Sequence, residues 1–366
     1  MFLKVFILAC LPVIFCGEIV AQSITDVHGE LLQPGAPVGH VICSGPGCLR
    51  LLTYLQAQDR IAGVDDIETR HKILDARPYA LANPQFKQLP VFGEFRGKDN
   101  PEQILNLVPQ PDLIFKTFPL MGHNPVELQE KTGIPVVALD YGDLGKNCSQ
   151  LYETLRQMGS LLGKDRRAQE VITFFEETIA DLRQRTASID ADHRPSAYIG
   201  GVAARGPHGF QSTEPQYPPF TFINARNLAF DEFAVKRGLS GSNISKEKII
   251  VWDPDYLFLD LATLQLEGAG GGLHELKTDP AYQLLTAVKK KRVYGLLPYN
   301  LYAANYGSIL ANAYFLGKLI YPDRFEDIEP TEKADEIYSF LVGKPVFAEM
   351  SSLFMNLVFQ PIQLTE

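Results

Sequence analysis

Two segments, one in each half of the chain, repeat the same order of residue types. The first covers residues 102–115 and the second residues 247–258. In each segment a glutamate opens a short apolar stretch that suits a helical turn, and a Pro-Asp pair stops that turn. An apolar run typical of a buried parallel strand then follows. The repeat therefore predicts two similar α/β lobes.

The length and charge of the chain agree with that division. A chain of 366 residues exceeds what one hydrophobic core usually serves, so each lobe can bury a core of its own. The formal net charge is −9, which argues against nucleic acid or an anionic membrane surface as the main partner. A small ligand held in a local pocket remains compatible with this charge.

The first 21 residues have the pattern of a cleaved secretory signal. Lys4 precedes a mostly apolar run over residues 5–15, and the small residue Ala21 ends the segment. The run is short for a membrane span, so we predict export to a periplasmic or extracytoplasmic location, with cleavage near Ala21. The alternatives are an uncleaved membrane anchor, or a lipoprotein modified at Cys10 or Cys16, which the positions of these cysteines fit less well.

Export would leave three cysteines, Cys43, Cys48 and Cys148, in an oxidising compartment. Cys43 and Cys48 flank a Ser-Gly-Pro-Gly turn and could form a disulfide, which would leave Cys148 free. Alternatively, all three are small buried thiols. No regular Cys/His ligand spacing is present, so we do not expect a structural zinc site.

Apolar runs alternate with helix-sized segments along most of the chain, which predicts βαβ units and mostly parallel sheets. The expected strands are residues 41–43, 61–64, 91–92, 113–115, 136–139, 197–202, 256–261 and 292–296. The expected helices include residues 48–55, 247–252, 281–288, 305–319 and 332–341.

Between the two halves, residues 149–187 contain no proline and favour helix throughout, with Gly159 and Gly163 as the weak points. We predict one long helix here, kinked or not, about 55 to 60 Å in length if it is continuous. The expected organisation is then a signal peptide, an N-terminal lobe, a connecting helix, a C-terminal lobe and a C-terminal helical extension, at residues 1–21, 22–147, 148–190, 191–325 and 326–366.

Several short motifs occur in a characteristic order. They are the Ser-Gly-Pro turn after the first strand, Arg-Ile-Ala-Gly-Val-Asp at 60–65, the two Glu-to-Pro-Asp copies, the long middle helix, Lys-Arg-Val-Tyr at 291–294 and Tyr-Pro-Asp-Arg-Phe at 321–325. In this order, the sequence resembles the extracytoplasmic substrate-binding proteins of iron-complex and cobalamin ABC importers over essentially the whole mature chain. The resemblance implies two lobes joined by a rigid helix, a ligand cleft between them and limited hinge motion. It also implies a monomer without enzyme activity or a resident cofactor.

The same resemblance gives the repeated glutamates a role. Binding proteins of this family dock on the membrane permease through one surface glutamate in each lobe, and the matching positions here are Glu102 and Glu247. The first copy departs from the pattern by two extra residues before its aspartate. A simpler interpretation is that both glutamates only favour a helix N-terminus through the helix dipole.

In open parallel sheets, ligands bind beyond the carboxyl ends of the strands. This rule selects Ser44, Gly45, Pro46, Glu94, Phe95, Arg96, Lys116, Thr117 and Tyr141 in the first lobe. In the second lobe it selects Arg205, His208, Phe210, Glu214, Tyr217, Tyr299, Asn300, Tyr302, Asn305 and Tyr306. Tyrosines and asparagines suit a large polar ligand, and arginines suit an anionic chelate. Each tyrosine taken alone could equally be an amphipathic rim residue.

We therefore expect a binding protein that captures an iron complex, such as a siderophore or haem, or a cobalamin-like ligand for an ABC importer. One alternative is a bare metal ion or an oxyanion, for which His208, Glu214 and Tyr217 are a conceivable ligand set; the sequence does not fix a metal site. The other alternative is an exported enzyme, although no Gly-x-Ser-x-Gly or His-Glu-x-x-His motif is present.

Overall fold

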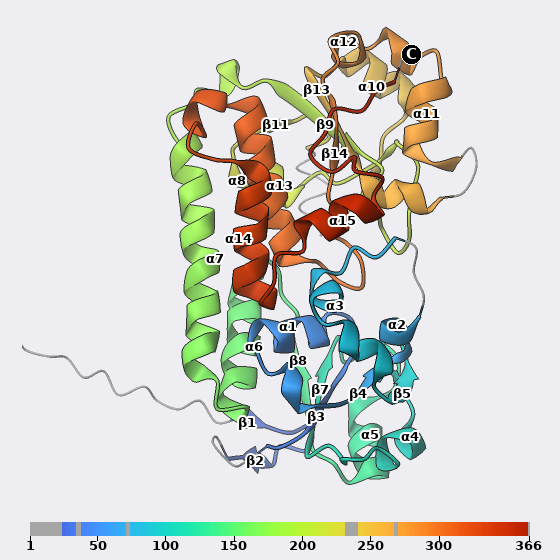
Figure 1. Cartoon of the computed structure of the whole chain (residues 1–366), viewed down its shortest axis with the longest axis vertical. Coiled ribbons are helices and arrows are strands. Elements are labelled where there is room, and N and C mark those ends of the chain that lie inside the picture. The colour runs from blue at the N-terminus through green and yellow to red at the C-terminus, as the bar shows by residue number, and fades with distance from the viewer. Residues whose placement is uncertain (1–23, 34–37, 71–73, 231–240, 267–269, 365–366) are drawn as a thin grey trace, which may run out of the picture.

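The computed structural model describes residues 24–33, 38–70, 74–230, 241–266 and 270–364. Within these residues the chain forms two lobes, which lie one below the other in Figure 1, with a long helix along one side. The expected signal peptide at residues 1–21, with Cys10 and Cys16, lies outside the described residues.

The N-terminal lobe contains a six-stranded sheet in the order β6-β5-β4-β3-β7-β8. Its strands are β3 (Val41–Ser44), β4 (Ile61–Asp65), β5 (Val91–Glu94), β6 (Lys98–Asp99), β7 (Leu113–Thr117) and β8 (Val136–Leu139). All neighbouring pairs are parallel except β5 and β6, which form an antiparallel edge. A small ribbon of β1 (Ile24–Thr25) and β2 (Leu31–Leu32) lies beside this lobe.

The C-terminal lobe contains a four-stranded parallel sheet in the order β11-β9-β13-β14. Its strands are β9 (Ser196–Gly200), β11 (Arg226–Asn227), β13 (Tyr256–Asp260) and β14 (Val293–Leu296). A separate antiparallel pair joins β10 (Ser212–Thr213) and β12 (Ser242–Asn243). Every long strand predicted from the sequence is present, with shifts of one or two residues at the ends.

Alternate residues of the N-terminal sheet face two different cores, as the pleat requires. Val41 and Cys43 belong to the large core that runs through both lobes, whereas Ile42 belongs to a second cluster with Phe92 and Leu128. Helix α1 (Cys48–Tyr54) packs on the first face. Helices α4 (Pro101–Leu105) and α5 (Pro125–Thr132) contribute to the second cluster. Both faces of the sheet are therefore covered, which explains why its strands read as continuous apolar runs.

The repeated segments have the same local structure in both lobes. Glu102 and Glu247 are each the second residue of a short helix, α4 and α10 (Lys246–Trp252). The aspartate of each Pro-Asp pair accepts a backbone N–H at the start of the neighbouring strand. Asp112 accepts the N–H of His40 at 2.9 Å, and Asp255 accepts the N–H of Ser196 at 2.8 Å. The aspartate thus fixes where the next strand pairs, which is a physical reason for the repeat.

The predicted extent of the connecting helix is wrong. The segment forms two helices, α6 (Cys148–Leu161) and α7 (Asp165–Thr186), which pack against each other as a hairpin. Gly163 adopts the left-handed φ of +62° between them, a conformation that glycine accepts without strain. Gly159 allows the close approach, since a Cβ there would lie 2.7 Å from that of Ala168. Helix α7 alone therefore spans the two lobes in Figure 1, and its 22 residues give roughly 33 Å.

The remaining helices follow the two sheets. They are α2 (Asp66–Thr69), α3 (Pro78–Ala82), α8 (Pro218–Phe222), α11 (Gly272–Thr278), α12 (Thr286–Lys289), α13 (Tyr306–Ile320), α14 (Pro330–Val342) and α15 (Phe347–Leu353). The helix expected over residues 281–288 is interrupted at Leu285, which is extended. Helix α14 packs on α13 and also on α1 and α3, and thereby connects the C-terminal residues to the N-terminal lobe.

Within the described residues, the C-terminal segment contacts the C-terminal sheet after its helices. After α15, the chain runs along β14, where the N–H of Phe359 donates to the carbonyl of Gly295 at 2.9 Å. The cysteines Cys43, Cys48 and Cys148 are free thiols, and the first two are buried. None of the described helices is both long and apolar enough to cross a membrane.

Candidate functional site

The loop of residues 297–305, between β14 and α13, lies where the two lobes meet. Arg50, on α1 of the N-terminal lobe, is fully buried and donates to the carbonyl oxygens of three loop residues. These bonds measure 3.1 Å to Leu301, 3.1 Å to Tyr302 and 3.0 Å to Ala304. A buried guanidinium needs several acceptors to offset its lost hydration. Arg50 therefore ties the loop of one lobe to the core of the other.

Two tyrosines of this loop donate hydrogen bonds to acidic side chains. One acidic side chain belongs to the N-terminal lobe and the other to the C-terminal lobe. Tyr302 donates to Asp65, the last residue of β4, and its hydroxyl also accepts the backbone N–H of Arg96 at 3.0 Å. Tyr299 donates to Glu214, which follows β10 in its own lobe. One loop thus contacts a buried or partly buried acidic group in each lobe.

Burial changes the proton affinity of both acids. Desolvation, assisted by the nearby Glu68 carboxylate, raises the pKa of Asp65 to about 8, although the bond from Tyr302 opposes this. Desolvation likewise raises the pKa of Glu214 to about 7. A carboxyl group with a pKa of about 8 is mostly neutral at pH 7, so Asp65 presents a carboxylic acid rather than a charge.

Two exposed arginines flank the loop, one from each lobe. Arg96 follows β5 and Arg205 follows β9, and both adopt left-handed backbone conformations, with φ of 66° and 60°. The segment before Arg205 is held by Asn300 of the loop, whose side-chain amide donates to the carbonyl of Ala203 at 2.8 Å. Left-handed non-glycine residues often mark functional sites. The loop thus contacts the backbone of Arg96 in one lobe and the segment next to Arg205 in the other.

An aromatic stack closes the other side of the junction. The rings of Tyr141 and Tyr306 are stacked with centroids 5.3 Å apart, and Phe118 stacks on Tyr141 at 5.7 Å. The Tyr306 hydroxyl donates to the carbonyl of Tyr141 at 3.0 Å, and the Tyr141 hydroxyl donates to that of Ala304 at 2.7 Å. Tyr141 and Tyr306 are buried, so in this structure they join the lobes.

Several predicted ligand residues lie inside the N-terminal lobe. Lys116 and Asp99 form a fully buried ion pair of 2.5 Å, and the Ser44 hydroxyl donates to Asp99 at 2.6 Å. Thr117 donates to the carbonyl of Pro46 at 2.9 Å. Gly45 has no room for a side chain, because a Cβ would lie 2.4 Å from the carbonyl oxygen of Thr117. These residues support the hairpin that carries Glu94 and Arg96, both exposed, and do not reach the surface themselves.

A similar division holds in the C-terminal lobe. Phe210 is core, with its ring 5.2 Å from that of Tyr282. Tyr217 is buried and its hydroxyl accepts from Asn312 at 3.2 Å. Asn305 is buried and donates to the carbonyl of Tyr299 at 3.0 Å. His208, in contrast, is exposed, with its ring nitrogen 2.8 Å from the carbonyl oxygen of Ala204.

Metal-ligating side chains do not gather among the described residues, which contain no group of three or more His, Cys, Asp or Glu suited to a metal ion. The set of His208, Glu214 and Tyr217 is correspondingly divided between an exposed loop and the interior. The structure thus brings Tyr302, Asn300 and the backbone of Arg96 together at the junction, with Arg205 two residues from the segment that Asn300 holds. Glu94 and His208 are exposed, and the other predicted ligand residues are buried or partly buried.

Two important residues were not assigned from the sequence. Arg50 is a lone cation in an otherwise apolar helix, a pattern that signals a buried charge in need of partners. Asp65 ends a fully buried strand, so the strand-end rule could have selected it. Their partners on the loop lie more than 200 positions away, with a separation of 237 between Asp65 and Tyr302, which no local pattern reveals.

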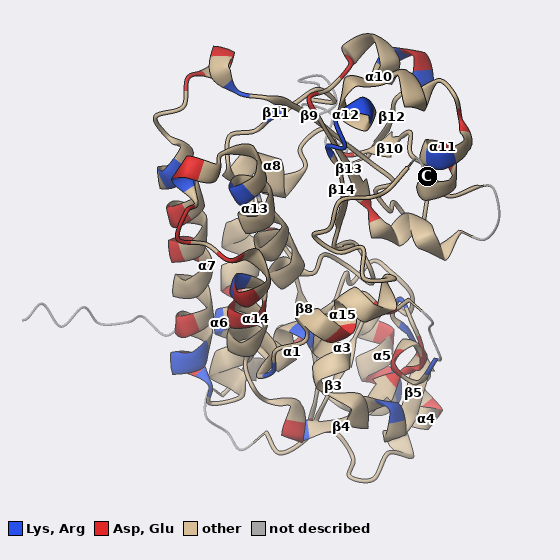
Figure 2. Cartoon of the chain, turned by 45° about the horizontal axis from the view of Figure 1, so that its top comes forward, with Lys and Arg blue, Asp and Glu red and all other residues tan. Residues whose placement is uncertain are grey.

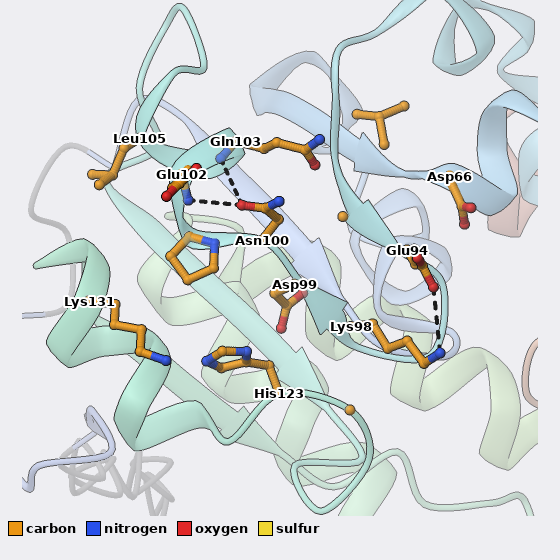
Figure 3. Close-up of a pocket in the computed structure, with 14 residues that line it drawn as sticks. Asp66, Glu94, Lys98, Asp99, Asn100, Glu102, Gln103, Leu105, His123 and Lys131 are labelled. Atoms are coloured by element: carbon orange, nitrogen blue, oxygen red, sulfur yellow. Dashed lines mark hydrogen bonds and ion pairs between the residues drawn. The ribbon is translucent and has the colours of Figure 1, made fainter.

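The helices that carry the repeated glutamates lie at opposite ends of the molecule, away from the junction, and each helix adjoins a surface hollow. A hollow of about 1240 Å³ adjoins Glu102, and Figure 3 shows His123 and Lys131 beside it. A smaller hollow of about 350 Å³ adjoins α10 at Lys248 and Trp252. Each is lined by one lobe only. Figure 2 shows both acidic and basic residues around α4, α5 and β5, so this surface has no single sign of charge.

Comparisons with known proteins agree with this architecture. The periplasmic binding protein family model matches residues 41–299. An uncharacterised ABC transporter substrate-binding lipoprotein of Bacillus subtilis, YvrC, is 21% identical over 233 residues, which cover 62% of this chain and 67% of YvrC.

Solved structures share the fold at low sequence identity. The molybdate-binding protein MolA of Haemophilus influenzae is 17% identical, with a TM-score of 0.64 over 88% of this chain and 98% of MolA. A periplasmic haem-binding protein of Pseudomonas aeruginosa is 22% identical, with a TM-score of 0.54 over 78% of this chain and 93% of that protein. The predicted fold class, two α/β lobes with mostly parallel sheets and a long joining helix, is confirmed. With the family match over most of its length, the chain belongs to the periplasmic binding proteins, the extracytoplasmic substrate-binding components of ABC importers.

Proposed function

We propose that this protein captures an iron complex, such as a siderophore or haem, or a cobalamin-like ligand, and delivers it to an ABC importer. The ligand would lie at the junction of the lobes, against the loop of residues 297–305. The proposal depends mainly on the positions of Arg96 and Arg205. They are exposed arginines, one from each lobe. The backbone N–H of Arg96 donates to Tyr302 of the loop, and Asn300 of the loop holds Ala203, two residues before Arg205.

The chemistry around these arginines supports a large anionic ligand. The Arg96 guanidinium lies 5.1 Å from the Phe95 ring centroid, and the Phe95 ring is 6.2 Å from that of Tyr302. Aromatic rings beside guanidinium groups can stack on a flat ligand and pair with its anionic groups. The neighbouring carboxyl of Asp65 is mostly neutral at pH 7 and so would not repel an anion.

An oxyanion is the second candidate, because the same two arginines could pair with a small tetrahedral anion. MolA, which shares the fold, binds molybdate. The two candidates differ in size and in the need for aromatic contacts. Phe95 and Tyr302 would contribute little to a small oxyanion but much to a chelate.

For delivery, we propose that Glu102 and Glu247 contact the membrane permease. Both are exposed at the second position of a short helix, and each helix adjoins a surface hollow. Opposite charge on the permease would guide the complex and fix its orientation. We further propose that the leader is cleaved near Ala21 and that the mature protein acts as a monomer.

Native mass spectrometry of protein purified from its own host tests the proposed ligand. We expect a bound mass with an iron isotope pattern, or the mass of haem or a cobalamin. A retained oxyanion would instead support the second candidate. Protein that carries no ligand, and that binds neither iron complexes, cobalamin nor oxyanions when titrated, would refute both.

A further inference from the structure

The phenol ring of Tyr302 belongs to the C-terminal lobe but is bound by the N-terminal lobe. Its hydroxyl donates to Asp65 and accepts the backbone N–H of Arg96 at 3.0 Å, and its ring lies beside Phe95. Tyr302 itself has a φ of 51°, a conformation that tyrosine rarely adopts. The N-terminal lobe therefore has a small site that recognises an aromatic hydroxyl group, and the chain fills it with its own side chain.

The surface around this site carries an aromatic ring and two arginines, of which Arg70 also forms an ion pair with Asp66. The Phe95 ring lies 4.5 Å from the Arg70 guanidinium and 5.1 Å from that of Arg96. Both arginines are exposed. Two guanidinium groups beside one partly buried ring favour a ligand that combines an aromatic group with negative charge.

The hydrogen-bonding groups of the site suit a ligand with two adjacent oxygen atoms better than a ligand with one. The Oδ1 atom of Asp65 is buried and has no hydrogen-bond partner among the described residues, whereas Oδ2 accepts from Tyr302. A buried polar atom without a partner calls for an explanation. Because the carboxyl is mostly neutral at pH 7, it offers one O–H donor, and the N–H of Arg96 offers a second. A catecholate group presents two neighbouring oxygen acceptors on one ring.

We propose that the place of the Tyr302 phenol is a subsite for a catechol ring of the transported metal chelate, and that Tyr302 fills it until the chelate displaces it. This inference rests on the proposed function and narrows its ligand class to catecholate chelates. The ring would stack near Phe95, its two oxygens would accept from the Asp65 carboxyl and the Arg96 N–H, and the Arg96 guanidinium would offset part of the charge of the complex.

Binding of three iron probes to the full mature protein tests this subsite: the ferric complex of 2,3-dihydroxybenzoate, ferric citrate and haem. Calorimetry would compare the wild type with Tyr302→Phe, which removes only the competing hydroxyl. The matched control is Tyr314→Phe, because the Tyr314 hydroxyl also donates to a carboxylate, Asp181 at 2.8 Å, but on α7. We expect Tyr302→Phe to bind the ferric catecholate about 3- to 10-fold more tightly, as for loss of one hydrogen bond that must be broken.

The control variant should bind the catecholate within about twofold of the wild type, a change too small to represent a hydrogen bond. Arg96→Ala provides a second readout and should weaken catecholate binding about 10-fold, as for a charged contact. Equal affinities of Tyr302→Phe and Tyr314→Phe for the ferric catecholate would refute the proposed subsite. Binding of haem or ferric citrate without the catecholate would overturn it but leave the proposed function intact. Failure to bind any of the three probes would overturn the subsite, and cobalamin binding would then decide whether the proposed function survives.

Discussion

Replacing Arg50 with methionine tests whether the loop of residues 297–305 depends on a buried charge for its position. Methionine has a similar length, so the core stays filled while the donors are lost. The carbonyls of Leu301 and Tyr302 lose a donor that lies 3.1 Å away, whereas that of Ala304 keeps its bond from the Tyr141 hydroxyl at 2.7 Å. Both carbonyls are partly buried: that of Tyr302 then has no donor among the described residues, and that of Leu301 keeps only the Asn305 side-chain amide at 3.5 Å.

Each orphaned buried acceptor costs about 1 to 3 kcal/mol. One unpaired and one weakly paired carbonyl, both partly buried, therefore predict a loss of about 1 to 3 kcal/mol in the free energy of unfolding. The loss is reduced somewhat because the variant no longer buries a charge. The free energy of unfolding of Arg50→Lys should lie between those of Arg50→Met and the wild type. A lysine ammonium group cannot reach all the carbonyls that the two guanidinium nitrogens reach.

Urea unfolding followed by circular dichroism provides the measurement, with the midpoint compared at unchanged slope. Arg166→Met is the matched control. The Arg166 side chain is 94% exposed and forms one ion pair within α7, so its loss should change stability by less than about 0.5 kcal/mol. If Arg50→Met were no less stable than that control, the loop would be held by its other contacts and the role of Arg50 would be refuted.

Three further predictions concern docking, ligand capture and pH. Reversing the charge of Glu102 and Glu247 together should sharply reduce uptake through the reconstituted transporter while ligand affinity stays unchanged; normal uptake at physiological salt would mean that these glutamates only begin helices. Arg205→Ala should weaken ligand binding by about 1 to 3 kcal/mol without lowering the urea midpoint, and unchanged affinity by calorimetry would remove Arg205 from the site. Because the pKa of Asp65 rises from 3.8 to about 8 on folding, the folded state holds a proton that the unfolded state releases between these values. Stability should therefore fall as pH rises from about 4 to about 8, and urea midpoints of Asp65→Asn should show a shallower fall; parallel profiles for both proteins would contradict the assignment.

Much of the fold could be predicted because its determinants are local. Buried parallel strands such as β7 have continuous apolar runs, and the aspartate after each proline marks where the next strand starts, as Asp112 and Asp255 show. The hairpin of α6 and α7 could not be predicted in the same way. Gly163 is compatible with a helix, and what favours the turn is the packing of Gly159 on Ala168, a tertiary contact.

The strand-end rule located the site but not the exposure of each side chain. Ser44 is the last residue of β3 and Arg96 follows β5, yet Ser44 is buried against Asp99 and Arg96 is exposed. What separates them is the buried Lys116–Asp99 pair, which draws Ser44 inward and holds the hairpin that presents Arg96. A sequence pattern cannot show which of several polar residues at one sheet edge will pair with each other.

Two of the connections of the loop to the N-terminal lobe, those at Arg50 and at Tyr302, differ in strength, which indicates how the lobes would separate. Arg50 is fully buried and bonds three loop carbonyls, so breaking this end would leave several buried polar groups without partners. Tyr302 is only partly buried, and its hydroxyl has two partners, Asp65 and the N–H of Arg96. A ligand that offers oxygens to these two groups replaces what the tyrosine gave them. Separation is therefore expected to begin at Tyr302, with Arg50 as the fixed end, so that ligand entry exchanges one set of hydrogen bonds for another while the core of both lobes stays intact.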